Sequence, residues 1–597
     1  MSKEICQEIK LIAENALDKI ESSLPSETII KFIMFTETLR VLDFHSLSSY
    51  NPTSKLSEVP KFDIMKMGWN LSTSYLFEGF KTSGFPIVES TKETFGSTSS
   101  LLYHFGCITM LKRTIDMVKS GALSVVKTDD NTFVFEKTKN VNSQFLDDLE
   151  FTNLEELEEE LKEKTGEYYK EWNIIEKDDL EKAFGSPGNF LSFTDKEFNH
   201  YSSENIEKLL HDQVRPWDSG HGIMMGYGST FDIDMHFLGK ATELVGKWRD
   251  EAGLHPKTKI GNITGGDLMI VVLFMTSFHL KHISYGLVAS KKHPEISIKQ
   301  SLTLWGPLED LINDIVEFSG FKKSIITEAF DSIILKPDDV KLLKKHTSKF
   351  MPLVIDIGNG IVLRPVSSIN RNPLLTISQI LEYRNPNFRN DISLYREEWL
   401  RNNLYAMFSG ARYKNVVGNI NLKTGNKIDT DIDAAIFDRM TGELALFQIK
   451  WQDFFFNDIN KLKSRASNLT KGLDDWTLKV NNWITSNGLN KLLQTLRIKS
   501  TEGSPISKVY LFAISKNAAR MKGYGYQTTV DNLAITNWPQ FARNRFEIGP
   551  SEKVFRDLFE ALKEQEKDNI ETKPLPAEFI IGNKNFKYKD LWSTYGK

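Results

Sequence analysis

The pattern of apolar and polar positions divides the chain into helical and strand-like stretches. Residues 1–145 follow mainly a helical period, broken at Ser124–Lys137 by two β-rich runs around a polar turn, which predicts a hairpin. A second hairpin is predicted at Pro352–Val366, where Asn359-Gly360 supplies the positive φ angles of a tight turn. The longest apolar run, Leu268–Phe278, is too short to span a bilayer and indicates a buried core segment.

These patterns and the breaks between them predict four parts. The parts are a mainly helical region (1–200), a mixed α/β region of unassigned role (201–380), a sandwich domain (385–550) and a C-terminal extension (551–597). The first part includes an acidic helix at Asp147–Lys182, and Asn-Pro breaks in Asn370–Asp391 indicate a joint before the third. The expected fold class is multidomain α/β, with a mainly helical α+β N-terminal region before a C-terminal α/β/α sandwich that has a mixed sheet.

Composition and charge narrow the functional classes. The hydrophobic and charged fractions are those of an ordinary globular protein, which excludes collagen-like, disordered and disulfide-scaffold classes. Two cysteines fit a reducing compartment, and acids in the amphipathic N-terminus argue against a signal peptide, so we expect a cytoplasmic protein without a membrane segment. Residues 401–597 carry 30 Lys and Arg against 21 Asp and Glu, whereas residues 1–400 are net acidic. This asymmetry indicates that the C-terminal third meets a polyanion such as nucleic acid.

Two groups of candidate metal ligands occur in the first two thirds of the chain. In the sequence FDIDMHF, a strand would place Asp232, Asp234 and His236 on one face, where they could hold a divalent metal. We favour a half-exposed strand whose polar residues face water, because such triplets often arise by chance. His279 and His282 lie one helical turn apart, but a zinc site needs further ligands, so we favour capping or surface histidines.

The stretch Lys427–Gln452 carries the strongest chemical signal. It reads as two strands around a turn. Alternation puts Gln448 and Lys450 on one face of the second strand, and Asp431 and Asp433 on one face of the first. If the strands pair, a carboxylate for Mg²⁺ lies beside an amine for a water or a phosphate. Metal-assisted phosphodiester hydrolysis requires that combination.

This arrangement resembles the PD-(D/E)XK nuclease superfamily, whose restriction-endonuclease-like fold has an Asp on one strand and Glu-x-Lys or Gln-x-Lys at the end of the next. The matching residues are Asp433 and Gln448-Ile449-Lys450, and the Gln form followed by an aromatic residue is similar to the Mrr-like branch. The resemblance covers about residues 393–541 and implies an upstream helix with a glutamate that faces the site. Glu397 shares a helical face with an apolar stripe, whereas Glu398 points about 100° away and is the alternative.

The resemblance implies a site that uses Mg²⁺ or Mn²⁺. Asp433 and Glu397 are expected to bind the metal, with Gln448 as a further ligand or as the group that orients a metal-bound water. Lys450 is expected to stabilise charge on the scissile phosphate or to help activate the water. Basic residues that follow the motif are candidates for phosphate contacts: Lys461, Lys463, Arg465, Lys516, Arg520 and Lys522.

The leading hypothesis is a metal-dependent endonuclease of restriction or antiphage defence that cuts double-stranded DNA. Its N-terminal region would be a sensor or regulator of the nuclease domain. It would act through a regulatory or defence-system partner or through self-association as a homo-oligomer. One alternative is an RNase on the same fold, because nothing in these residues reads the 2′-hydroxyl. The other is a catalytically inactive nucleic-acid-binding module in which Gln448 marks decay of the site. Dependence on metal separates the nuclease from the binding module.

Overall fold

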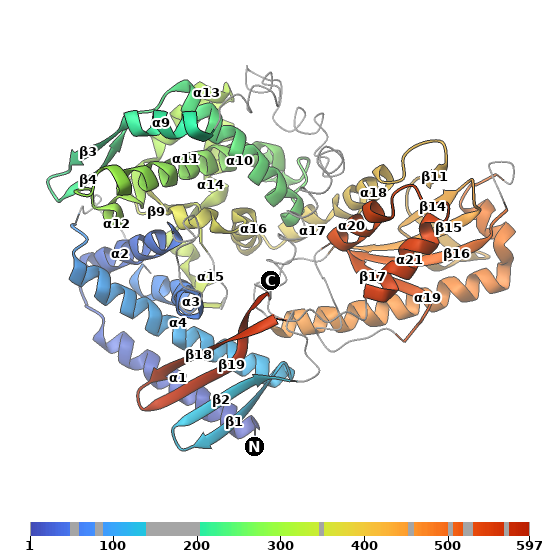
Figure 1. Cartoon of the computed structure of the whole chain (residues 1–597), viewed down its shortest axis with the longest axis horizontal. Helices are drawn as coiled ribbons and strands as arrows, with labels where there is room; N and C mark the ends of the chain where they lie inside the picture. The colour runs from blue at the N-terminus through green and yellow to red at the C-terminus, as the bar shows by residue number, and fades with distance from the viewer. Residues whose placement is uncertain are drawn as a thin grey trace.

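The computed structural model describes residues 2–47, 59–77, 88–138, 203–345, 351–451, 459–499, 505–516, 529–565 and 572–595. Over these residues the chain is a mixed α/β protein with mixed sheets. Figure 1 shows a larger body formed by the N-terminal and middle segments, and a second body built around its own sheet, from α18 (Arg396–Ala406) to α21 (Val554–Gln565). The acidic helix expected at Asp147–Lys182 lies outside the described residues.

The larger body begins with four helices and a hairpin. These are α1 (Ser2–Ser23), α2 (Thr28–Ser46), α3 (Val59–Leu76), α4 (Lys92–Ser120), β1 (Leu123–Asp129) and β2 (Thr132–Lys137). The antiparallel pairing of β1 with β2 confirms the hairpin predicted from the two β-rich runs. Helices α3 and α4 approach closely at Gly106, where a Cβ would lie 1.9 Å from the carbonyl oxygen of Ile64. Only glycine permits this approach.

The last residues of the chain complete the sheet of this N-terminal part. β18 (Thr572–Ile581) and β19 (Lys584–Tyr595) form a hairpin, and β19 pairs in parallel with β2, so the strand order is β1-β2-β19-β18. The ring of Phe586 stacks on Phe133 with centroids 5.2 Å apart. Helix α21 packs instead on the sheet of the second body. The extension expected at 551–597 is thus divided between the two bodies.

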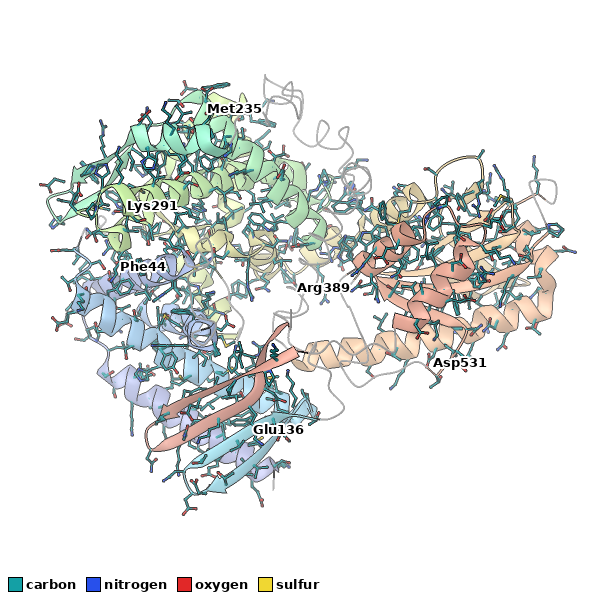
Figure 2. All side chains as sticks on the ribbon, in the orientation of Figure 1. Phe44, Glu136, Met235, Lys291, Arg389 and Asp531 are labelled. Carbon is teal, nitrogen blue, oxygen red and sulfur yellow. The ribbon has the colours of Figure 1, made fainter. Side chains whose placement is uncertain are left out.

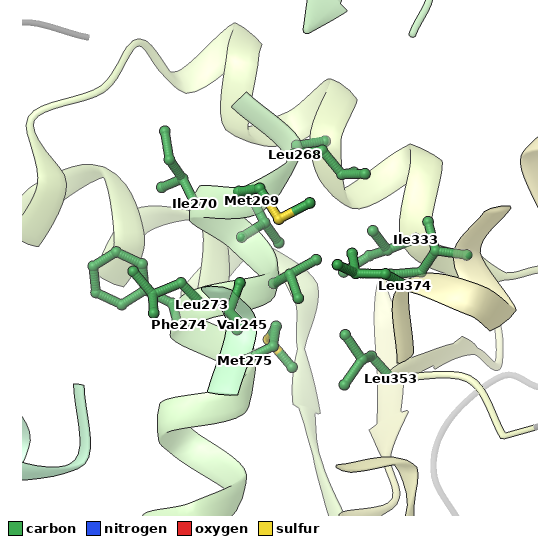
Figure 3. Packing of buried hydrophobic residues seen from close by; sticks show 14 of the residues in the cluster. Val245, Leu268, Met269, Ile270, Leu273, Phe274, Met275, Ile333, Leu353 and Leu374 are labelled. Carbon is green, nitrogen blue, oxygen red and sulfur yellow. The ribbon is translucent and has the colours of Figure 1, made fainter. Parts of the chain in front are cut away.

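The middle part is built around α11 (Gly265–Lys292), which begins with a capping box between Thr264 and Asp267. Figure 3 shows Leu268 and Met275 of this helix packed with Ile333 and Leu374, which confirms that the apolar run forms core. The neighbouring helices are α9 (Ser203–Gln213), α10 (Phe231–Ala252), α12 (Ile298–Ser301), α13 (Leu308–Ser319), α14 (Lys323–Ile333) and α15 (Val340–Lys345). The strands are β3 (Val214–Asp218), β4 (Ile223–Tyr227), β5 (Lys259–Ile260), β6 (Ile263–Thr264), β7 (Leu304–Pro307), β8 (Ile334–Leu335), β9 (Val354–Asp356) and β10 (Ile361–Arg364).

By length and composition, α11 is the one helix in the described ranges that could cross a membrane. Of its most apolar window, 78% is buried inside the protein. A buried core helix meets the same criteria, so this is weak evidence for a membrane segment.

The strand predicted for FDIDMHF is wrong, because this sequence forms the first turns of α10. Its alternating apolar residues imitate a strand, but the acids of the first turn suit the positive end of a helix dipole. The carboxylate of Asp234 also pairs with Lys281 of α11 at 2.5 Å. Among the described residues, no group of three or more His, Cys, Asp or Glu is arranged to hold a metal, here or elsewhere.

The interpretation of the two α11 histidines as capping or surface residues is also wrong. His279 and His282 are both buried. The ring of His282 lies 2.8 Å from the Tyr227 hydroxyl and 2.8 Å from the carbonyl oxygen of Ser301, so it joins β4 to the end of α12. Burial lowers the pKa of His282 to about 4, which keeps the ring neutral. The turn predicted at Asn359-Gly360 is confirmed, with φ angles of 51° and 70°.

The joint predicted at Asn370–Asp391 contains two helices, α16 (Pro373–Arg384) and α17 (Phe388–Ser393). The side chain of Asn372 accepts a hydrogen bond from the Leu374 N–H at 3.0 Å, so the Asn-Pro pair begins a helix here. Arg389, labelled in Figure 2, lies on α17 between the two bodies.

The second body has a five-stranded mixed sheet. After α18 come β11 (Tyr413–Val416), β12 (Ile420–Thr424), β13 (Lys427–Ile432), β14 (Ala434–Asp438), β15 (Glu443–Lys450), α19 (Ile459–Thr495), β16 (Lys508–Ser515), β17 (Leu533–Asn537) and α20 (Trp538–Ile548). The strand order is β11-β14-β15-β16-β17, with β14 antiparallel to β15 and the last three strands parallel. Strands β12 and β13 form a separate hairpin.

Alternate residues of the central strands face two different helical layers. Ile436, Phe447 and Ile449 lie in one core with residues of α18, α20 and α21. Leu444 and Leu446 lie in another core with α19 and the β12–β13 hairpin. The alternation expected in the second strand is therefore confirmed, and the sheet is covered by helices on both faces.

Candidate active site

Asp433 lies between β13 and β14, where the chain passes from one hairpin into the central sheet. Its backbone N–H donates to the carbonyl oxygen of Phe447 at 3.1 Å, which fixes it opposite the end of β15. Its Oδ2 accepts hydrogen bonds from the Ile449 N–H at 2.7 Å and from the side-chain amide of Gln448. The strand pairing thus brings together the acid and the amide, as the sequence predicted.

Lys450 ends β15 on the same side. Its Nζ lies 3.7 Å from Oδ2 of Asp433. The Lys450 side chain is 39% exposed and that of Asp433 is 3% exposed, so the amine lies between the buried carboxylate and the solvent. Burial raises the pKa of Asp433, and the charge of Lys450 and the two hydrogen bonds oppose this rise.

Glu397 lies in the first turn of α18, and its carboxyl interacts electrostatically with Asp433 and Lys450. The residue as a whole is exposed, yet partial loss of solvation raises the pKa of its carboxyl. The negative charges of Asp433 and Asp431 raise this pKa further, whereas Lys450 and Arg401 lower it. A divalent cation would relieve this mutual repulsion of carboxylates.

Arg401 ties α18 to the site and was not predicted to do so. Its guanidinium donates to the carbonyl oxygen of Asp433 at 3.1 Å and to the side chain of Asn419. Arg401 follows Glu397 by four positions, and that spacing on one helical face was the signal available in the sequence.

A cavity of about 560 Å³ opens beside these residues, between the β12–β13 hairpin and α19. Gln448, Lys450, Asp429 and Asp431 line it from the strands. The indole N–H of Trp476, on α19, donates to the carbonyl oxygen of Asp431 at 2.7 Å. The α19 face was missed, although its members recur at helical spacing: Asn468, Gly472, Asp475, Trp476 and Lys479.

The donor set suits a hard divalent cation chemically, although it is not assembled as a metal cluster in the described residues. Oδ2 of Asp433 is occupied by its three neighbours, whereas its Oδ1 has no hydrogen-bond donor among the described residues. That oxygen, the amide oxygen of Gln448 and the carboxylate of Glu397 are the ligand types that Mg²⁺ and Mn²⁺ prefer.

The expected phosphate contacts are only partly covered by the structure. Lys516 is buried at the end of β16, where its Nζ lies 5.6 Å from the ring centroid of Trp451 and 5.9 Å from that of Trp538. It therefore packs within the protein. Lys461, Lys463 and Arg465 lie on α19 with side chains outside the described part, and Arg520 and Lys522 lie outside the described residues altogether.

No family model, curated protein or solved structure matches this chain. Its function is therefore argued from the geometry of the site.

Proposed function

We propose that the chain is a metal-dependent nuclease, and specifically a DNA endonuclease of restriction or antiphage defence. The observation that carries the proposal is the contact among Asp433, Gln448 and Lys450 at the adjoining ends of β14 and β15. Glu397 adds a further carboxylate from the preceding helix. A mixed five-stranded sheet between helices supports the finer proposal of a restriction-endonuclease-like fold.

In this proposal Asp433 and Glu397 hold Mg²⁺ or Mn²⁺, and Gln448 is a further ligand or orients a bound water. The metal would supply Lewis acidity at the scissile phosphate. Lys450 stabilises negative charge on that phosphate from its half-exposed position. Gln448 and the Ile449 N–H fix the direction of the Asp433 carboxyl and favour its ionised form, because both donate to the same oxygen.

The proposed substrate is double-stranded DNA, bound from the basic C-terminal third. The proposed location is the cytoplasm. The N-terminal and middle segments would carry the regulatory role, either through a defence-system protein or through a second copy of the chain.

The test is incubation of the protein with plasmid DNA, single-stranded DNA and RNA, in Mg²⁺, in Mn²⁺ and in EDTA. We expect cleavage of DNA that requires the metal and that Lys450→Met slows by about 100- to 1,000-fold. Cleavage of RNA alone would support an RNase. Binding of DNA without cleavage in any metal would support an inactive binding module and overturn the proposal.

A further inference from the structure

The C-terminal end of α10, in the larger body, contacts the residue that precedes Glu397. Arg396 is the first residue of α18 and is buried. Its guanidinium donates to the carbonyl oxygen of Ala252 at 2.9 Å and to that of Gly253 at 3.2 Å. These are carbonyl groups at the end of α10, where the helix dipole favours a cation.

The same end of α10 also contacts the residue that follows Lys450. Gly253 has φ +64°, and a Cβ built on it would lie 2.6 Å from the ring of Trp451 and 2.6 Å from Nε of Arg396. Trp451 is therefore in close contact with the backbone immediately after α10. Its ring also lies 5.6 Å from the Arg396 guanidinium and is stacked on Trp399, with centroids 5.9 Å apart.

Further aromatic contacts hold the start of α18 to this helix end. The Arg249 guanidinium of α10 lies 5.2 Å from the ring centroid of Trp399. His255, two residues beyond Gly253, stacks on Tyr395 with centroids 4.7 Å apart. The larger body thus contacts the immediate neighbours of both Glu397 and Lys450.

We propose that Arg396 and Trp451 are positioning residues through which the end of α10 sets the places of Glu397 and Lys450. This inference rests on the proposed nuclease function. One peptide bond separates each positioning residue from the group that it places, so a shift of α10 reaches both groups at once. Misplacement of a reacting group by about 1 Å can lower turnover on the order of 100-fold.

Gly253→Ala tests this contact, because the added methyl group would displace Trp451 and Arg396. Gly320→Ala is the matched control. Gly320 also follows a helix in the larger body and has φ +72°, but a Cβ there meets no atom within 4 Å. Both variants place an alanine at a positive φ angle and carry the same backbone strain. Only Gly253→Ala also disturbs the contact of α10 with Arg396 and Trp451.

We expect Gly253→Ala to lower kcat by about 10- to 100-fold with little change in KM for DNA, and Gly320→Ala to keep the wild-type kcat. Arg396→Gln, which loses the charged fork without adding bulk, should also lower kcat and leave KM unchanged. It provides the same test if Gly253→Ala does not fold. Unchanged kcat in both junction variants overturns the inference.

Hydrogen exchange of the metal-free protein provides a readout that does not depend on activity. We expect Gly253→Ala, and not Gly320→Ala, to speed exchange in peptides that cover residues 396–406 and 443–451. If the wild-type protein cleaves no nucleic acid in any metal, the proposed function fails, and exchange still decides whether α10 orders these two segments. Equal exchange in the two variants overturns the positioning role.

Discussion

The side-chain amide of Gln448 donates a hydrogen bond to Oδ2 of Asp433, the same oxygen that accepts the Ile449 N–H at 2.7 Å. Both donors belong to β15, and the acceptor immediately precedes β14, so the pairing of the two strands holds the acid. The amide satisfies a buried carboxylate without adding charge. A carboxylate at position 448 would instead face Asp433 with a second negative charge.

Gln448→Glu should therefore destabilise the metal-free protein by about 1–3 kcal/mol, since a hydrogen bond is replaced by repulsion in a buried place. Mg²⁺ should reverse this loss, because a carboxylate suits a hard cation better than an amide does. We expect the variant to keep activity, to need less Mg²⁺ and to gain more in Tm from Mg²⁺ than the wild type. Thermal unfolding and cleavage are to be measured across a Mg²⁺ titration.

Gln448→Met is the control, because it removes the hydrogen bond without adding charge. Mg²⁺ should not reverse its loss of stability, because Met adds no ligand for the metal. If Mg²⁺ raises the Tm of both variants equally, charge at position 448 does not influence a metal site.

Lys450→Met should lower the cleavage rate by about 100- to 1,000-fold while the protein stays folded, because a charge that stabilises the transition state is lost from a half-exposed strand end. Single-turnover cleavage measures the rate, and thermal unfolding verifies the fold. The control is Lys508→Met. Lys508 is an exposed residue that pairs with the opposite end of β15, at Glu443. Equal rates for the two variants would remove Lys450 from the site.

The part of the site that the sequence predicted depends on local periodicity. Strand alternation places Gln448 and Lys450 together whatever the rest of the chain does, and helical spacing selects Glu397 in the same way. The approach of Asp433 to Gln448 needed only the assumption of a hairpin. The second body was accessible to sequence analysis because its central strands and helices follow one another along the chain.

The remaining features depend on contacts that leave little local trace. FDIDMHF alternates like a strand, but it is a helix that packs on α11, with Asp234 paired to Lys281. The pairing of β19 with β2 joins residues from opposite ends of the chain. Gly253 gives no sign in the sequence that it lies against Trp451. Such long-range pairings are selected by burial and shape in the folded state.

Stability at acidic pH should depend on Asp43 of α2, which is fully buried and accepts hydrogen bonds from Thr303 Oγ1 at 2.7 Å and from the Ser367 N–H at 2.8 Å. Burial raises the pKa of Asp43 to about 6, although these bonds oppose the rise. The folded state therefore binds this proton more tightly than the unfolded state. The resulting stabilisation, about 3 kcal/mol, is complete below the unfolded pKa of about 4 and is lost as the pH rises through about 6.

Asp43→Asn removes this proton and should remove the dependence. The difference in unfolding free energy, wild type minus variant, should fall as the pH rises from about 4 to about 7. Nearby His45 acts in the opposite sense, because burial and neighbouring lysines lower its pKa to about 4, but its contribution cancels in the difference. A difference that is flat or that rises over this range would show that Asp43 is ionised in the folded protein throughout.

Neutralisation of Lys461, Lys463 and Arg465 together should weaken DNA binding and flatten its salt dependence. Each phosphate contact that is lost should remove about one unit from the log–log slope. Binding is to be measured over a salt series in EDTA, with the catalytically impaired Lys450→Met protein as the background. The control is a triple neutralisation on the β18–β19 hairpin, at exposed Lys573, Lys587 and Lys589. If the two triple variants have equal slopes, the residues of α19 make no phosphate contacts.

Glu397 and Glu398 are adjacent, and the structure predicts opposite outcomes for them. Asp433, Asp431, Lys450 and Arg401 all influence the carboxyl of Glu397. Its removal therefore takes a ligand from the proposed metal site, and we expect Glu397→Ala to be inactive at every Mg²⁺ concentration, as we expect of Asp433→Ala.

Glu398→Ala should cleave DNA at nearly the wild-type rate, because a step of one residue turns the side chain by about 100° around α18. A Mg²⁺ titration of cleavage for the single variants decides the question. Activity in Glu397→Ala with none in Glu398→Ala would mean that α18 presents its other face to the substrate. In that case the helix start that Arg396 anchors on α10 would be rotated in the active complex, because Arg396 and Glu397 are consecutive residues of one turn.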